Sequence, residues 1–252
     1  MKAIEHLHKV TFSKEQMSKL SKDQQGVLAV LSFAVTEANT LQRIYIHSEH
    51  QNTGQDDIDI LVATQRFVLL RTWSAALFEF IEFVKSLSKK NGTNCSQLIE
   101  WQSNCLSLGK DVVKGEGYTL ARNLRHEAAN HYNFGAAKKN LDYLSPSANL
   151  NMYMHALNGN SYFPMGEEVM FIGRINRTGE GPESIQGDTS KIDNWMAWNI
   201  KASKWLNDCN FEFYSLFIRS LKLRAVKRCY WIPPELVSSE ESQNVPLFIR
   251  SS

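Results

Sequence analysis

The feature that most constrains the fold of this chain is an uninterrupted helical periodicity over residues 56–90. Apolar residues recur there at three- and four-residue spacing, which predicts one long helix with a broad apolar face. Two aspartates, beginning at Asp56, favour the start of a helix, and two lysines followed by Gly92 favour its end. The apolar face comprises Ile58, Leu61, Val62, Leu69, Trp73, Leu77, Phe80, Ile81, Val84 and Leu87.

Charged side chains also lie within this periodic stretch. Arg71 and Glu79 could face a polar site, but we interpret them as solvated or paired surface charges, because buried unpaired charges are rare.

Four further segments carry helical signals. Ser13 and Gln16 resemble a capping box, which predicts a short helix over residues 14–20. Apolar periodicity predicts longer helices over residues 23–50, 95–108 and 193–227. The buried stripe expected for residues 95–108 comprises Leu98, Trp101, Cys105 and Leu108.

The last long helix, within residues 193–228, is rich in tryptophan. Trp195, Trp198 and Trp205 are three and seven residues apart, which is the spacing of a core stripe. A base-stacking platform is the alternative interpretation of the same three rings. Basic residues gather near the end of this helix, where the helix dipole favours them.

Three segments near the C-terminal half differ from the helical pattern. Residues 150–175 predict a small β-hairpin insertion around Asn158-Gly159-Asn160, since short apolar runs flank that turn. Residues 174–190 are polar and contain several glycines, which predicts a loop. The polar tail over residues 238–252 is expected to be loosely held.

Together these patterns predict a mainly α fold. We expect a helical bundle of four to five long helices, with the small β-hairpin attached and tryptophans in the core. No domain boundary is visible, so residues 1–252 are expected to form a single domain.

Composition limits the classes of function. A net charge of +2 over 252 residues is too small for nucleic-acid binding by bulk charge, so any such site must be local. The chain contains no apolar run of bilayer length and no apolar core of a signal peptide, which predicts a cytoplasmic protein that does not bind membranes. The four cysteines lack CxxC spacing and are expected to be free thiols.

One pair of histidines has metal-ligand spacing. His47 and His50 are three residues apart near the end of a predicted helix. No carboxylate or cysteine partner is evident nearby, and histidines at this position also suit the helix dipole. We therefore predict no metal site and no cofactor.

The densest group of cations and histidines lies within residues 118–143. It is expected on a helix over 118–131 that continues over 136–144, and comprises Arg122, Arg125, His126, His131, Lys138 and Lys139. A histidine can exchange protons near neutral pH, and the arginine fork matches a phosphate. Metal-free cleavage of RNA needs both functions, because a base must deprotonate the 2′-OH while a cation stabilises the attacked phosphate.

Helix geometry complicates the pairing of Arg125 with His131. Residues six apart on a straight helix are ~9 Å apart along the axis and about 120° apart around it. A bend, convergence of long side chains or a second subunit could bring them together. Glu127 and His131 share a face, so Glu127 could fix the tautomer of His131, and Tyr132 could contact phosphate or a base.

The segment RHEAANHY resembles the signature of HEPN-domain proteins, R-x(4–6)-H with a polar residue after the arginine. In this resemblance Arg125 is the motif arginine, His126 the polar neighbour and His131 the motif histidine, and Tyr132 follows closely. The likeness extends in outline over residues 23–144, a helical core with the motif on a late helix. A register starting at Arg122 has unsuitable spacing to either histidine.

The resemblance implies a metal-independent endoribonuclease of toxin–antitoxin, phage-defence or other antiviral systems. Arg125 would bind phosphate and His131 would be the acid–base residue, with His126, Glu127, Tyr132 and Arg122 in support. It also implies a homodimer with the active site at the two-fold axis, RNA as substrate, and an antitoxin or defence-system protein as partner.

Two other interpretations stay open. Some HEPN proteins are catalytically inactive binding or dimerisation modules. The cluster could also be a solvated helix face, with its histidines satisfied by ordinary hydrogen bonds.

Overall fold

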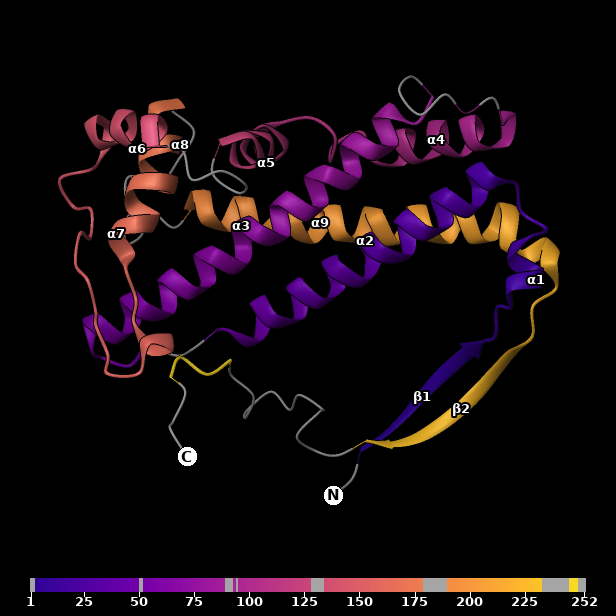
Figure 1. The fold of residues 1–252 in the computed structure, drawn as a ribbon, viewed down its shortest axis with the longest axis horizontal. Helices are drawn as coiled ribbons and strands as arrows, with labels where there is room; N and C mark the ends of the chain where they lie inside the picture. Colours follow the sequence, from indigo (N-terminus) through magenta and orange to yellow (C-terminus); the bar gives the residue numbers. More distant parts are fainter. Residues whose placement is uncertain are drawn as a thin grey trace.

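The structure is a computed structural model that describes residues 3–49, 52–88, 93, 95–127, 134–178, 190–232 and 245–248. Over these residues the protein is mainly helical, with a small antiparallel sheet of two strands (Figure 1). The finer prediction, a HEPN-like bundle of four to five long helices, stays a prediction.

The helices differ widely in length. They are α1 (Lys14–Met17), α2 (Lys22–His47), α3 (Asp56–Ser86), α4 (Ser96–Leu108), α5 (Glu116–Glu127), α6 (Phe134–Asn140), α7 (Pro164–Glu167), α8 (Gly173–Thr178) and α9 (Ser190–Phe213). A π-helical turn over Glu168–Ile172 joins α7 to α8, and a second, Tyr214–Ile218, continues α9. The strands are β1 (Ala3–Val10) and β2 (Ala225–Ile232).

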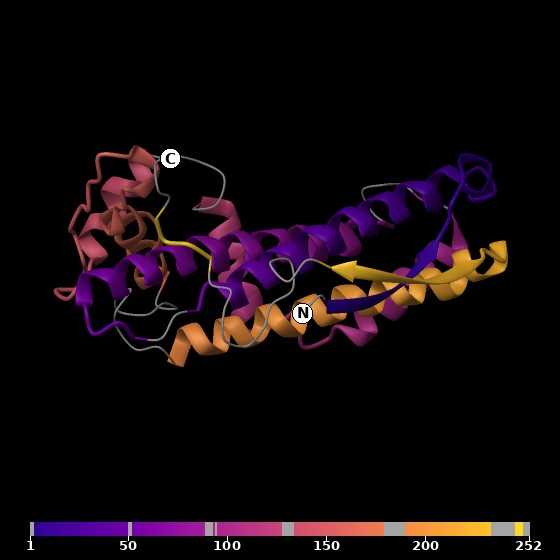
Figure 2. The same ribbon diagram turned by 90° about the horizontal axis from the view of Figure 1, so that it is seen from below.

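Three long helices form the body of the molecule. Helices α2 and α3 pack against each other, and α9 packs on both (Figures 1 and 2). Helices α4 and α5 each lie across α3 and α9. The smaller elements between residues 134 and 178, which we call the end lobe, gather at one end of the body and meet α3 through α7.

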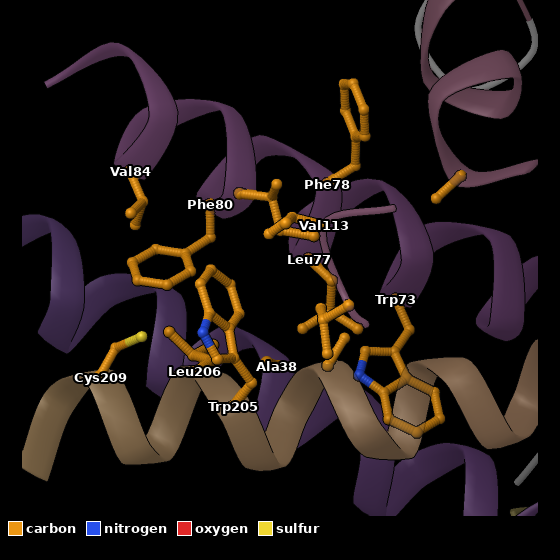
Figure 3. Packing of buried hydrophobic residues seen from close by; sticks show 14 of the residues in the cluster. Ala38, Trp73, Leu77, Phe78, Phe80, Val84, Val113, Trp205, Leu206 and Cys209 are labelled. Carbon is orange, nitrogen blue, oxygen red and sulfur yellow. The ribbon is translucent and has the colours of Figure 1, made fainter. Parts of the chain in front are cut away.

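The core lies where these helices meet, and large side chains fill it (Figure 3). Trp73, Trp101 and Phe213 are among its fully buried members. The core interpretation of the last helix is confirmed, because Trp195, Trp198 and Trp205 are buried as well.

The buried indole groups also join the helices by hydrogen bonds. The Nε1–H of Trp73 donates to Ser203 Oγ at 2.9 Å, and that of Trp195 donates to Ser74 Oγ at 2.8 Å. Three more donate to backbone carbonyls: Trp101 to Cys209, Trp198 to Val112 and Trp205 to Cys105. Because buried indoles need such a partner, these bonds fix how α3, α4 and α9 align.

Several sequence predictions are confirmed. Helices α2, α3 and α4 occupy the predicted segments, and Ser13 and Gln16 form the predicted capping box. Leu98, Trp101 and Cys105 form a buried stripe on α4, but Leu108 is 63% exposed, so that member was wrong.

The predicted β-hairpin over residues 150–175 is wrong. Residues 164–178 form α7, the π-helical turn and α8, and Pro164 at the first helical turn suits a helix start. A short apolar run cannot be told from a buried helix by periodicity alone, which explains the error. Only an isolated bridge between Tyr153 and Tyr162 pairs backbone in this segment. The loop predicted from residue 174 is helical as far as Thr178.

The sheet occurs instead between the two ends of the chain. The helix predicted to reach residue 227 ends near Leu221, and Lys222 takes a left-handed conformation with φ of 50°. Residues 225–232 then form β2, antiparallel to β1. Local periodicity could not reveal this strand, because its partner lies more than 200 residues earlier in the sequence.

The described part of the tail, residues 245–248, contacts the body, and the rest of the predicted loose tail over residues 238–252 lies outside the described residues. The Val245 N–H donates to the carbonyl of His47 at 2.8 Å. The Tyr162 hydroxyl donates to the carbonyl of Leu247 at 2.6 Å.

Candidate functional site

Helix α5 carries most of the candidate motif. Arg122, Arg125, His126 and Glu127 belong to this helix, which the structure describes over Glu116–Glu127. His131 and Tyr132 lie outside the described residues, and of Arg125, His126 and Glu127 the structure describes the backbone only. The structure therefore confirms a helix at the motif arginine and leaves its pairing with His131 as a prediction.

The side chain of Trp198 in α9 packs directly against the backbone of α5 at Gly117. A Cβ atom added at Gly117 would lie 2.6 Å from Trp198 Cβ and closer still to the ring, so only glycine fits this position against α9. Gly115, with φ of 91°, makes the turn into the helix. Leu120 and Ala121 are buried between α5 and the body, whereas Arg122 is exposed.

Helix geometry relates the motif arginine to these anchors. Arg125 follows Ala121 by four residues and Tyr118 by seven, so the three positions fall along one side of α5. Tyr118 packs on Phe78 of α3, with ring centroids 5.5 Å apart. The backbone position of Arg125 thus continues the side of α5 that meets α3.

A polar cluster joins α5 to α3 beside Arg122. The Tyr118 hydroxyl donates to Glu82 Oε1 at 2.8 Å, and Lys85 Nζ lies 3.4 Å from the same carboxylate oxygen. Lys85 Nζ also lies 3.8 Å from the centroid of the Tyr118 ring, a cation–π contact. We call Glu82, Lys85, Tyr118 and Arg122 the α3–α5 polar cluster.

The cluster shifts the titration of two of its members. Burial, followed by the hydrogen bond to Glu82 and the charge of Glu82, raises the pKa of Tyr118 to about 12. Burial lowers the pKa of Lys85, and the charge of Arg122 lowers it further, while Glu82 opposes both effects. Tyr118 is therefore a neutral hydrogen-bond donor at physiological pH, next to two cationic side chains.

Sequence reasoning did not single out this cluster. Glu82 and Tyr118 are 36 residues apart, and each alone resembles an ordinary surface residue of a helix. The only available signal was the density of charged residues late in α3, which does not identify partners.

The end lobe contains buried charged side chains that the sequence also did not single out. Glu168 is fully buried in the π-helical turn, where one oxygen accepts the Asn149 N–H at 3.1 Å. Arg174 is 9% exposed at the start of α8. π-helical turns occur frequently at functional sites, and this one lies in the lobe that begins directly after the motif segment.

One charged side chain of α3 is paired with a carboxylate of the end lobe. Arg71 forms a bidentate ion pair with Glu167 of α7, with N–O distances of 3.1 and 3.2 Å, which confirms its interpretation as a paired charge. His47 lies at the end of α2, and its predicted companion His50 lies outside the described residues.

Comparison with known proteins gives no family for this chain. No protein-family model matches it, and neither a curated protein nor a solved structure is significantly similar to it.

Among the helices that the structure describes, none has both the length and the apolar character needed to cross a membrane.

Proposed function

We propose that the protein is a metal-independent endoribonuclease of HEPN type. Arg125 binds the scissile phosphate, and His131 exchanges protons with the 2′-OH and the leaving oxygen. His126, Glu127, Tyr132 and Arg122 support these two groups. The observation that carries the proposal is the RHEAANHY segment, whose arginine lies on a helix anchored to the body through Gly117 and Trp198.

The electrostatics around α5 are consistent with binding of an RNA phosphate. Arg122 is exposed one helical turn before His126, and Lys85 lies near it, so the described part of the site presents two cations against the carboxylate of Glu82. A local excess of cations can attract a polyanion even though the chain as a whole is almost neutral.

The proposal includes a homodimer. Two copies of α5 at a two-fold axis would supply two arginines and two histidines to one cleft, which removes the difficulty that residues six apart face different sides of a helix. Toxin–antitoxin or antiviral systems are the setting that we propose, with an antitoxin or another defence-system protein as a partner.

The decisive experiment compares the wild type with His131→Ala on a labelled single-stranded RNA. We expect His131→Ala to lower the cleavage rate by at least about 100-fold, the usual contribution of a general acid–base group, with an unchanged circular dichroism spectrum. His155→Ala is the matched control, because His155 is an exposed histidine of the end lobe. We expect EDTA to leave wild-type cleavage unchanged.

Undiminished cleavage by His131→Ala would contradict the assignment of the acid–base residue. Loss of activity on chelation would point instead to a metal site. Tight RNA or protein binding by the wild type without any turnover would identify the catalytically inactive module as the function.

A further inference from the structure

The two-stranded ribbon of β1 and β2 contributes none of its described side chains to the hydrophobic core. It leaves the helical body beside α1 and runs back along α2 (Figure 1). Among the described residues, the main packing of each strand is with the other strand and not with a helix. Leu7 and Tyr230 are exposed on one face of the ribbon, and Val10 is exposed on the other.

The register of the ribbon places cations beside apolar groups. Leu7 lies opposite Arg228, and Lys9 lies opposite Val226. Residues directly opposite each other, and residues two apart on one strand, share a face. Lys9, Leu7, Arg228 and Tyr230 therefore lie on the same face, where Glu5 lies opposite Tyr230. Lys227 lies on the other face, opposite His8.

The ribbon concentrates positive charge in a chain that has little of it. Strand β2 contains Lys227 and Arg228 and no acidic residue, and Lys222 and Arg224 shortly precede it. Strand β1 adds one lysine, Lys9, and one glutamate, Glu5. The whole chain has an excess of only two positive charges. A chain with so little net charge can bind nucleic acid only through a local cluster of cations, and the ribbon is such a cluster.

These properties favour a polyanion over a second copy of the chain. Lysines and arginines on exposed strands oppose edge-to-edge pairing between sheets, and two copies would bring like charges together. An exposed aromatic ring two residues from an arginine on the same face suits a single strand, because the cation contacts a phosphate while a base stacks on the ring.

We propose that the ribbon is a docking arm for single-stranded RNA. Lys9 and Arg228 contact phosphates on the face where Tyr230 stacks on a base, and Lys227 contacts a phosphate where the RNA crosses the edge of β2 to the other face. The choice of RNA as the polyanion rests on the proposed ribonuclease function. The docking itself rests on the charge, exposure and register of the ribbon.

The test uses fluorescence anisotropy with a fluorescein-labelled single-stranded RNA of about 15 nucleotides. All proteins carry His131→Ala, so that cleavage does not obscure binding. The double variant Lys227→Ala with Arg228→Ala should bind the RNA at least about tenfold more weakly. It should also reduce the magnitude of the slope of the logarithm of the association constant against the logarithm of the salt concentration by about 1.4, because each phosphate contact with a single strand contributes about 0.7. Tyr230→Ala should weaken binding with little change in that slope.

Two control variants separate lost charge from lost structure. Arg43→Ala with Lys204→Ala removes two exposed cations from α2 and α9 and should leave affinity and slope unchanged. Lys227→Arg with Arg228→Lys keeps both charges and should retain the wild-type slope.

Unchanged affinity and slope in the Lys227→Ala/Arg228→Ala protein would overturn the ribbon proposal. Equal losses in the Arg43→Ala/Lys204→Ala control, tighter binding to duplex DNA of the same length, or a change of oligomeric state caused by the ribbon variant would also overturn it. The proposed nuclease fails separately, if cleavage survives His131→Ala in a protein whose ribbon binds RNA.

Discussion

At the scale of single residues, the α3–α5 polar cluster couples a phenol, a carboxylate and two cations. Tyr118 provides the hydroxyl that satisfies Glu82, and its ring lies under the ammonium group of Lys85. One side chain thus links α5 to α3 through both a hydrogen bond and a cation–π contact. The contribution of Tyr118 to the free energy of unfolding should therefore depend on pH.

We predict that Tyr118→Phe flattens the loss of stability at high pH. The pKa of Tyr118 is about 12 in the folded protein, above its ordinary value of 10.0. The neutral phenol therefore contributes stability in full below pH 10.0, and this contribution is lost as the pH rises through about 12. Thermal melting of both proteins between these pH values measures the difference.

At neutral pH, Tyr118→Phe should also cost about 1 kcal/mol, since it removes a hydrogen bond to a partly exposed carboxylate. Tyr143→Phe, which removes an exposed hydroxyl, is the control and should follow the wild type at every pH. A difference in stability between wild type and Tyr118→Phe that stayed constant from pH 10.0 to about pH 12 would show that the cluster does not hold the phenol in its neutral form.

The sequence predicted single residues where one helix face determines their surroundings. Trp195, Trp198 and Trp205 were assigned to the core from spacing alone, and they are buried. Partners across helices could not be predicted in this way. Glu82 with Tyr118, and Arg71 with Glu167, meet only after the chain has folded.

At the scale of elements, α5 depends on the absence of a side chain at Gly117. The Trp198 ring occupies the space that a Cβ would need, and its indole N–H donates to the carbonyl of Val112 just before α5. The position of the motif arginine is therefore linked to α9 through one glycine and one tryptophan.

We predict that Gly117→Ala lowers the free energy of unfolding by about 1–3 kcal/mol, because the added methyl group must displace the packed side chain of Trp198. RNA cleavage should fall as well, since α5 moves. Gly26→Ala in α2 is the control: nothing lies within 4 Å of a Cβ added there, so it should stabilise the protein by about 0.5–1 kcal/mol. Urea denaturation with a cleavage assay measures both effects.

If Gly117→Ala were as stable as the wild type and as active, α5 would not need its close approach to Trp198 to hold the site.

Elements were predictable where periodicity is long, and unpredictable where it is short or where pairing is distant. Helices α2 and α3 repeat their apolar residues over many turns, so a chance pattern is improbable. The segment that became α7 and α8 contains only a brief apolar run, which fits a strand as well as a helix. Strand β2 follows α9 so closely that its cations resembled a helix end.

At the scale of the whole molecule, the end lobe is joined to the long helices by the packing of Phe171 on Phe67 and Trp195 and by polar contacts. The Arg71–Glu167 pair connects α3 to α7, and its side chains are 23% and 15% exposed. The Tyr153 hydroxyl adds a bond to Asp57 Oδ1 at 2.7 Å. Since the lobe follows the motif segment in the sequence, we expect its attachment to influence the proposed site.

We predict a coupling energy of about 1–2 kcal/mol between Arg71 and Glu167, because the pair is bidentate and partly buried. A double-mutant cycle with Arg71→Ala and Glu167→Ala, followed by urea denaturation, measures it. The Lys201–Asp111 pair, whose side chains are 57% and 79% exposed, provides the comparison and should give less than about 0.5 kcal/mol. Equal coupling energies in the two cycles would show that the Arg71–Glu167 pair stabilises the protein no more than an exposed ion pair does.

The pairing of β1 with β2 has a consequence for how the protein is made. A ribosome adds about 5–20 residues per second, so β1 emerges on the order of ten to forty seconds before its partner. Closing so long a loop is also entropically slow, which places ribbon formation after assembly of the helices. Nascent chains of this protein should therefore carry β1 unpaired until β2 has been synthesised, and chaperones that recognise extended apolar segments should bind β1 during that interval.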